Sequence, residues 1–293
     1  MSWDEEIDEI AHREKLAEEL GGPEKVARQH EFGKFTIRER LNLISDSETF
    51  REIGKLAGVS KYDNDGSLSS FMPSNFIFGT AEVSGRPVII SGDDFTVRGG
   101  SADASISGKR MQAEGLANEL RLPHIRLIDG MGGGGSVKTI EMSGRTYIPR
   151  VGGWDTIISH LGIAPSVSLA LGSVAGIGAA RVATSHYSVI VKDTAQMMIA
   201  GPALVDWANL GEVTKEELGA SDIHTRNGAI DDEVLSEEEA FSKARSFLSY
   251  LPTNIDEIPA RIPCTDPIGR TESFLRKVVP KDPRKVYKMR PII

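Results

Sequence analysis

Cysteine is almost absent from this sequence, since Cys264 is the one cysteine among 293 residues. An internal disulfide and a cysteine-ligated zinc site are therefore excluded. Aromatic residues make up 6% of the chain, and 34 lysines and arginines face 42 aspartates and glutamates, a formal net charge of -8. Nucleic-acid-binding surfaces are basic, so nucleic acid is excluded as a partner. The acidic start Met1–Glu6 resembles no secretory or transit peptide, and we expect a cytoplasmic protein.

Motifs for metal binding and for nucleophilic catalysis are missing as well. None of the six histidines has the i, i+4 spacing of a zinc-binding helix, and none lies beside a Gly-x-Ser-x-Gly turn. They are His12, His30, His124, His160, His186 and His224. The sequence therefore predicts that this chain binds no metal and provides no histidine base. Asp129 ends a predicted strand, and we interpret it as a cap or turn residue.

Residues 161–180 form the longest uncharged segment, which is long enough to span a bilayer. A proline, three serines and four glycines interrupt it, and a helix broken in this way would leave backbone groups unpaired in lipid. Val167, Leu169 and Leu171 alternate with smaller residues, as in a strand. The segment therefore predicts a buried strand, a glycine turn and the start of a helix, and no membrane contact.

A second glycine-rich stretch follows another predicted strand, residues 124–129. Gly130 comes next, and residues 132–135 are four consecutive glycines, which carry a high cost in backbone entropy. Bare main chain lets N–H groups approach a ligand closely and stabilise an oxyanion. Two such stretches suggest two sources of N–H donors at one carbonyl oxygen, although glycine turns also serve packing alone.

The remaining pattern predicts a mixed order of helices and strands, with no evident internal repeat. We expect helices at 3–20, 24–30, 37–44 and 236–251, strands at 75–83, 87–91, 187–191 and 196–200, and a flexible polar loop at 61–70. We divide the chain into a helical arm (1–50), a main domain (51–255) and an extended tail or linker (256–293).

Five segments occur in the order and spacing of a known family. They are Phe95–Ser101, Gly172–Gly176, Val191–Pro202, Gly211–Gly219 and Leu248–Asn254. With them the chain resembles the amino-terminal half of the carboxyltransferase (beta) subunit of biotin-dependent acyl-CoA carboxylases, of the propionyl-CoA, acetyl-CoA or methylcrotonyl-CoA type. The resemblance implies an α/β, crotonase-like (ClpP/crotonase) fold of repeated β-β-α units with an N-terminal helical arm.

The resemblance also implies roles for both glycine stretches. The oxyanion of the acyl-CoA thioester would accept from main-chain N–H groups of Gly132, Gly133, Gly134 and Gly135 and of Gly176 and Ile177. In this family the base is thought to be the biotin ureido group, so no side-chain base is expected. Two departures are visible: the first loop lacks the family's arginine, and Ile177 replaces a glycine, which places a β-branched side chain where positive φ is disfavoured.

By the same resemblance, coenzyme A would be bound by Arg98, Gly99, Gly100, Ser101 and Lys109, in a loop that opens a long helix. An anionic nucleotide needs local cations on a protein of net negative charge. The alternative is that Arg98, Lys109 and Arg110 form a solvated helix face.

The expected partners are a carboxy-terminal carboxyltransferase half or subunit, which carries the carboxybiotin loop in relatives, and a biotin carboxylase with its biotin carboxyl carrier. We expect a homo- or hetero-oligomer. Three alternatives stay open: an acyl-CoA decarboxylase component, a crotonase-like lyase or hydratase, and a non-catalytic CoA-binding subunit. A lyase would need a side-chain base, and a non-catalytic subunit would bind CoA and its thioesters equally.

Overall fold

A computed structural model describes the chain except for residues 1, 102–105, 107, 133–140, 142–143 and 145–152. The chain divides into two compact units, Met1–Pro259 and Ala260–Ile293. The second unit contains one short helix, α12 (Leu275–Val278), and most of its side chains are exposed. The predicted tail began at residue 256, a few residues before the boundary that the structure gives.

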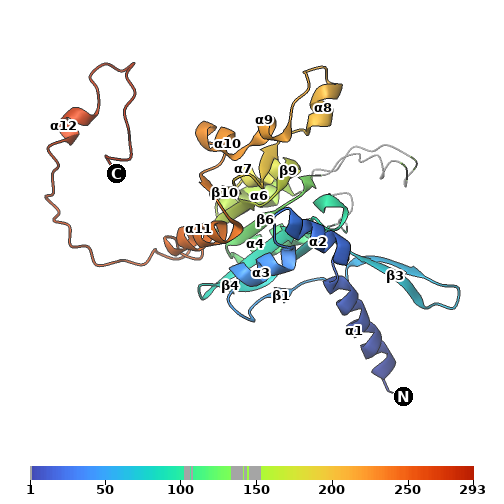
Figure 1. The fold of residues 1–293 in the computed structure, drawn as a ribbon. Coiled ribbons are helices and arrows are strands. Elements are labelled where there is room, and N and C mark those ends of the chain that lie inside the picture. The colour runs from blue at the N-terminus through green and yellow to red at the C-terminus, as the bar shows by residue number, and fades with distance from the viewer. Residues whose placement is uncertain (1, 102–105, 107, 133–140, 142–143, 145–152) are drawn as a thin grey trace. The chain divides into compact units, whose positions relative to one another are not determined.

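A seven-stranded sheet is the centre of the first unit (Figure 1). Its order is β1 (Arg51–Glu52), β4 (Phe76–Val83), β5 (Arg86–Asp93), β6 (His124–Ile128), β8 (Ser166–Ala170), β10 (Tyr187–Val191) and β12 (Asp232–Val234). β1, β4 and β5 are antiparallel neighbours, whereas β5, β6, β8, β10 and β12 run parallel. Every residue of β6 and β8 is buried, as expected for central parallel strands covered on both faces.

A second, three-stranded sheet holds β11 (Gln196–Met198), β9 (Ser173–Gly176) and β7 (Met131–Gly132), all parallel. Each strand follows a strand of the large sheet after a short connection: β7 follows β6, β9 follows β8, and β11 follows β10. After β9 the chain enters α7 (Ile177–Ala183). The chain therefore repeats a unit in which one strand of the large sheet is followed by one strand of the small sheet. The segment predicted as a glycine turn at 172–176 includes the short strand β9.

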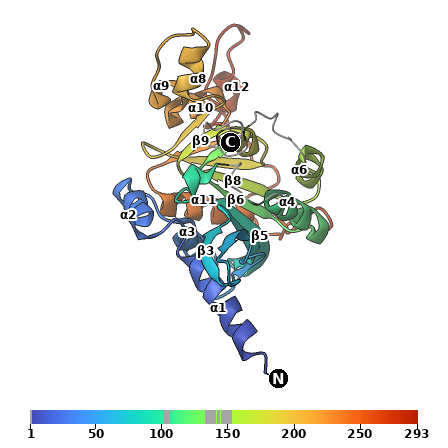
Figure 2. The ribbon, with the colours of Figure 1, turned by 90° about the vertical axis from the view of Figure 1, so that its right-hand side faces the viewer.

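Helices cover both faces of the large sheet (Figure 2). Phe76 and Phe78 pack with Ala113 of α4 (Lys109–Leu120), whereas Ile77, on the opposite face of β4, belongs to the main core. That core also contains side chains of α3 (Ile37–Ile44) and α11 (Glu237–Ser249). The predicted bounds of α3 agree with the structure. The side chains of Thr36 and Glu39 form a capping box, which fixes the start of this helix.

The N-terminal helices α1 (Asp4–Glu18) and α2 (Pro23–Glu31) also lie where the sequence predicted them. Among the described residues, the first unit also contains the helices α6 (Trp154–Leu161), α8 (Pro202–Trp207), α9 (Lys215–Gly219) and α10 (Ser221–Asn227). Within the described part of the chain, no helix is long and apolar enough to cross a membrane. Residues 161–180 contain β8, β9 and the start of α7.

The predicted polar loop at 61–70 is wrong. β2 (Gly58–Tyr62) pairs antiparallel with β3 (Leu68–Pro73), so only the residues between them form a turn. Gly66 has a φ of +88° and follows an aspartate, a typical hairpin turn pair. The polar side chains reflect the exposure of both hairpin faces, which conceals the alternation on which strand prediction depends.

A buried ionic cluster connects α4 to the large sheet. Glu114 of α4 accepts from His124 Nδ1 at 3.1 Å, from Arg126 Nη2 at 2.7 Å and from Arg181 Nη2 at 2.9 Å. Although burial opposes it, His124 and Arg126 hold the pKa of Glu114 well below its usual range. His160 of α6 packs edge-on against His124, with 6.3 Å between the ring centroids.

His160 makes the folding stability depend on pH. Its ring is fully buried, and burial lowers its pKa from 6.5 to about 4, with a further contribution from the charge of His124. As pH falls below 6.5 the unfolded chain takes up a proton that the folded chain refuses, so stability is lost towards pH 4. We expect His160→Leu to reduce the loss of unfolding free energy between pH 7 and 4.5 by about 2–3 kcal/mol.

Urea denaturation of both proteins at the two pH values measures this difference. His12→Leu, on the exposed surface of α1, is the matched control and should behave as the parent protein. An equal loss of stability in the His160 variant and the parent would contradict the expectation.

Candidate functional site

Both glycine stretches lie in neighbouring strands of the small sheet. β7 pairs in parallel with β9, and Gly132 is the partner of Gly176. Gly176 has φ +62° and ψ -123°, and α7 begins at the next residue, Ile177. The left-handed conformation thus falls on the glycine, while Ile177 is helical and carries no backbone strain. Gly133, Gly134 and Gly135 lie outside the described residues, so their predicted role as donors stays a prediction.

Three glycines bring the surrounding segments into main-chain contact. A Cβ on Gly130 would lie 2.6 Å from the carbonyl oxygen of Gly100, and one on Gly100 would lie 2.5 Å from that of Asp129. A Cβ on Gly178, in α7, would lie 3.1 Å from the Gly130 oxygen. No side chain fits at Gly130 or Gly100 without a shift of the backbone, and one at Gly178 would be tight. The predicted CoA loop, the first glycine stretch and the helix after the second one therefore meet at Gly130.

The predicted CoA loop forms a single turn, Arg98–Gly100, in which all three residues have positive φ. Arg98 and Gly99 line a cavity of about 610 Å³. Ser101 is buried, and the long helix begins at Lys109 rather than directly after the turn.

Lys109 does not line this cavity, and its side chain is directed into the protein. Its side chain donates to the carbonyl oxygen of Gly54 at 3.0 Å, and burial lowers its pKa to about 8. The neighbouring Arg110 pairs with Asp93 at 2.7 Å. Lys109 is 4% exposed, so the alternative of a solvated helix face is wrong for it.

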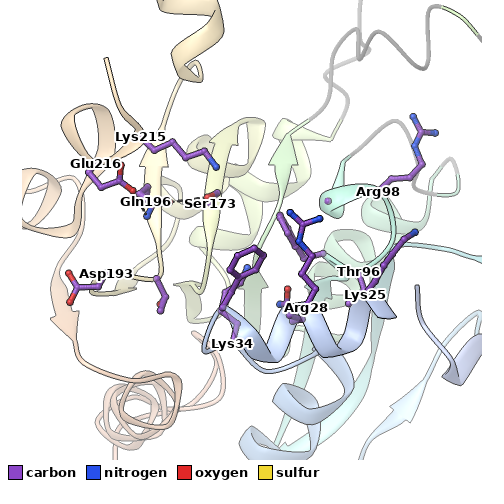
Figure 3. A pocket seen from close by; sticks show the side chains of 15 residues that line it. Lys25, Arg28, Lys34, Thr96, Arg98, Ser173, Asp193, Gln196, Lys215 and Glu216 are labelled. Atoms are coloured by element: carbon purple, nitrogen blue, oxygen red, sulfur yellow. Dashed lines mark hydrogen bonds between the residues drawn. The ribbon is translucent and has the colours of Figure 1, made fainter. Parts of the chain in front are cut away.

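Cations from the N-terminal helices form one wall of the 610 Å³ cavity (Figure 3). Lys25 and Arg28 extend from α2, and Lys34 follows that helix. Ser173 of β9, Gln196 of β11 and Lys215 of α9 lie across from them, with the acidic residues Asp193 and Glu216. We call this space the basic cavity. The sequence interpretation missed the contribution of α2, for which the available signal was the i, i+3 spacing of Lys25 and Arg28 on one helix face.

A smaller cavity of about 270 Å³ adjoins the basic cavity and is mainly apolar. Ser173 and Lys215 line both. The small sheet explains the change in polarity, because Ser173 pairs with Gln196 on the polar side, whereas Ala175 and Met198, two residues further along each strand, line the apolar space. The next residue of β9 is Gly176.

A buried ion network lies beneath the glycine segments. Both carboxylate oxygens of Asp129 accept from Lys34 Nζ at 3.0 Å, and one lies 2.9 Å from Arg40 Nη1. Arg40 also donates to Glu237 at 2.6 and 2.7 Å. The interpretation of Asp129 as a cap or turn residue is therefore wrong: its partners lie about 90–100 residues away in sequence, which short-range patterns do not report.

Among the described residues, no group of three or more histidines, cysteines, aspartates and glutamates could hold a metal ion. The geometry offers two paired glycine strands, β7 and β9, close to a basic cavity. Such an arrangement suits an anionic ligand with a carbonyl group.

Comparison with known families identifies the scaffold. The model of the carboxyl transferase domain matches residues 28–293. This chain belongs to the carboxyl transferase family. The predicted family is thereby confirmed, and so is the predicted crotonase-like α/β fold.

Curated relatives extend beyond this chain. The chain is 31% identical over 298 residues to the propionyl-CoA carboxylase carboxyltransferase subunit of Haloferax mediterranei, covering 100% of the chain and 56% of that relative. It is 29% identical to the mitochondrial propionyl-CoA carboxylase beta chain of Homo sapiens, covering 97% of the chain and 52% of that relative. The chain therefore spans about half the length of the curated relatives it matches.

A solved structure agrees with this picture. Transcarboxylase 12S, determined as a hexamer with methylmalonyl-CoA and methylmalonic acid bound, aligns with a TM-score of 0.77 and 26% identity. The alignment covers 100% of this chain and 56% of that one.

Proposed function

We propose that this chain is the acyl-CoA-binding part of a biotin-dependent carboxyltransferase, which transfers a carboxyl group from carboxybiotin to the α carbon of an acyl-CoA. The observation that carries the proposal is the pairing of Gly132 with Gly176 beside the basic cavity. Family membership supports the reaction class, and the methylmalonyl-CoA bound by transcarboxylase 12S supports an acyl-CoA ligand.

Removal of the α proton from a thioester places negative charge on the carbonyl oxygen. Main-chain N–H donors aimed at that oxygen contribute about 3–4 kcal/mol each to transition-state stabilisation. When bound, carboxybiotin would supply the carboxyl group as carbon dioxide, and its freed ureido nitrogen would take up the α proton. The enolate then forms the new carbon–carbon bond with carbon dioxide, so that atoms and charge balance. In this proposal the chain contributes the donors near Gly132 to Gly135 and near Gly176 and Ile177.

The basic cavity is the proposed seat of the coenzyme A phosphates. Lys25, Arg28 and Arg98 supply positive charge there, against an overall net charge of -8. Gly100 allows the Arg98 turn to approach Gly130, so a ligand held by this turn would lie near the first glycine stretch. Lys109 would act indirectly, by holding the start of α4 against the Gly54 carbonyl.

We expect Arg28→Gln to weaken coenzyme A binding about tenfold, because a charge-assisted hydrogen bond contributes about 1.5 kcal/mol or more. Titration calorimetry at low and moderate salt measures this loss, which should shrink as salt rises. Arg226→Gln, which removes an exposed arginine of α10 outside the cavity, is the matched control. Equal affinities of the parent, the variant and the control would contradict the placement of the phosphates.

Calorimetry with propionyl-CoA, acetyl-CoA and free CoA tests the function itself. A carboxyltransferase site should bind at least one thioester more tightly than free CoA, since the carbonyl adds hydrogen bonds. Equal affinities for all three ligands would favour a non-catalytic CoA-binding subunit. A failure to bind any of them would overturn the proposal.

The proposed partners are the carboxy-terminal carboxyltransferase half or subunit and a biotin carboxylase with its biotin carboxyl carrier. The hexamer of transcarboxylase 12S supports an oligomeric assembly, which we propose to be cytoplasmic. Size-exclusion chromatography with light scattering measures the assembly state.

A further inference from the structure

One buried guanidinium contacts both chain segments that lead into the glycine strands. Arg40 extends from α3 and is fully buried. Its Nη1 lies 2.9 Å from an Asp129 oxygen, and its Nη2 donates to the carbonyl oxygen of Leu171 at 3.2 Å. Glu237 of α11 accepts from Nε and Nη2 on the opposite side, which fixes the plane of the group.

The two contacted residues occupy equivalent places in the repeated strand-strand units. Asp129 lies two residues before Met131, the first residue of β7, and Leu171 lies two residues before Ser173, the first residue of β9. The second connection is also bonded to the end of β6, because the Leu171 N–H donates to the Ile128 oxygen at 2.9 Å. Arg40 therefore ties together the points where the chain leaves the large sheet for the small one.

The space around Asp129 leaves little freedom for this arrangement. A Cβ on Gly172 would collide with the Asp129 carboxylate and lie 2.9 Å from Lys34 Nζ. Gln29 of α2 donates to the same carboxylate at 3.1 Å. Gln29 and Lys34 also line the basic cavity, so one carboxylate links the cavity wall to the glycine strands.

We propose that Arg40 is a positioning residue, which acts through Asp129 and Leu171 to set the spacing of the two donor segments around Gly132 and Gly176. The inference rests on the proposed function. Arg40 itself contacts no ligand in this arrangement, since it is fully buried. A displacement of about 1 Å in a reacting geometry lowers turnover by about 100-fold, so a shift in either connection affects chemistry more than binding.

The test is isotope-edited infrared spectroscopy of saturating 1-13C-propionyl-CoA bound to the parent chain and to Arg40→Lys. Lysine keeps the charge but cannot bridge Asp129, Leu171 and Glu237 together. We expect the thioester carbonyl band to shift to lower frequency in the parent and to return toward its frequency in water in Arg40→Lys, while free CoA binds about equally to both.

Arg126→Lys is the matched control. Arg126 is another fully buried arginine, paired with Glu114 and bonded to the Thr184 carbonyl oxygen, and it contacts neither connection. Arg126→Lys should lower the melting temperature and retain the band shift. If Arg40 had only a structural role, Arg40→Lys would give this same result. An unchanged band in folded Arg40→Lys would overturn the inference.

If Arg40→Lys does not fold, Asp129→Asn tests the same connection with an isosteric side chain. We expect the same loss of band shift, and an unchanged band in folded Asp129→Asn would equally overturn the inference. A parent chain that shows no band shift at all would instead reject the proposed function, so the two failures are distinguishable.

Discussion

Replacement of Arg40 by leucine is expected to lower the free energy of unfolding by about 3–5 kcal/mol, because it removes the charged partner of the buried Glu237 and one of the two charged partners of the buried Asp129. Asp129 and Glu237 are 0% and 4% exposed, and both pair with this guanidinium. Against the effect of burial, the Asp129 and Glu237 carboxylates raise the pKa of Arg40, so it stays charged. Urea denaturation followed by circular dichroism measures the loss.

Arg226→Leu is the control for the loss of an arginine. It removes an exposed partner of Asp222 in α10, and exposed pairs contribute about 0–1 kcal/mol. A loss below about 1 kcal/mol in Arg40→Leu, similar to the control, would show that the network under the glycine strands does not depend on this side chain.

Ile177→Pro is expected to reduce carboxyl transfer by the complete carboxylase about 100- to 1,000-fold, as removal of one oxyanion donor does. Ile177 is the first residue of α7, where a helix tolerates proline and where the main-chain N–H has no partner within the helix. The substitution therefore removes the N–H at a position where α7 itself does not use it. Initial rates at saturating acyl-CoA measure the loss.

Ile177→Ala separates the donor from the side chain. Alanine keeps the N–H and shortens the wall that isoleucine presents, so the rate should change far less than in the proline variant, although the preferred acyl group can change. Equal losses in the two variants would mean that the side chain, and not the main-chain donor, matters at this position.

Much of the scaffold could be predicted from local signals. The helix at residues 37–44 has a capping box and a periodic apolar face, and the structure places it at the same bounds. The hairpin of β4 and β5 follows from alternating apolar residues on either side of a Ser-Gly-Arg turn. The two glycine stretches were identified from composition alone, and the structure pairs Gly132 with Gly176.

The parts that sequence reasoning missed depend on contacts between distant residues. Asp129 meets Lys34 and Arg40, about 90 residues earlier, and no local pattern reports such a network. The strand-strand repeat was implied only by the family resemblance and not by internal sequence similarity, because β7, β9 and β11 share position but not sequence. The basic cavity likewise combines α2 with strands of the small sheet.

The infrared carbonyl band of 1-13C-propionyl-CoA bound to the unaltered chain tests the central claim most directly. N–H groups from the two glycine segments should polarise the thioester and move the band below its frequency in water, because preorganised donors polarise a carbonyl more than solvent does. A band that stays at its position in water, in a sample where calorimetry shows the ligand bound, would contradict the account.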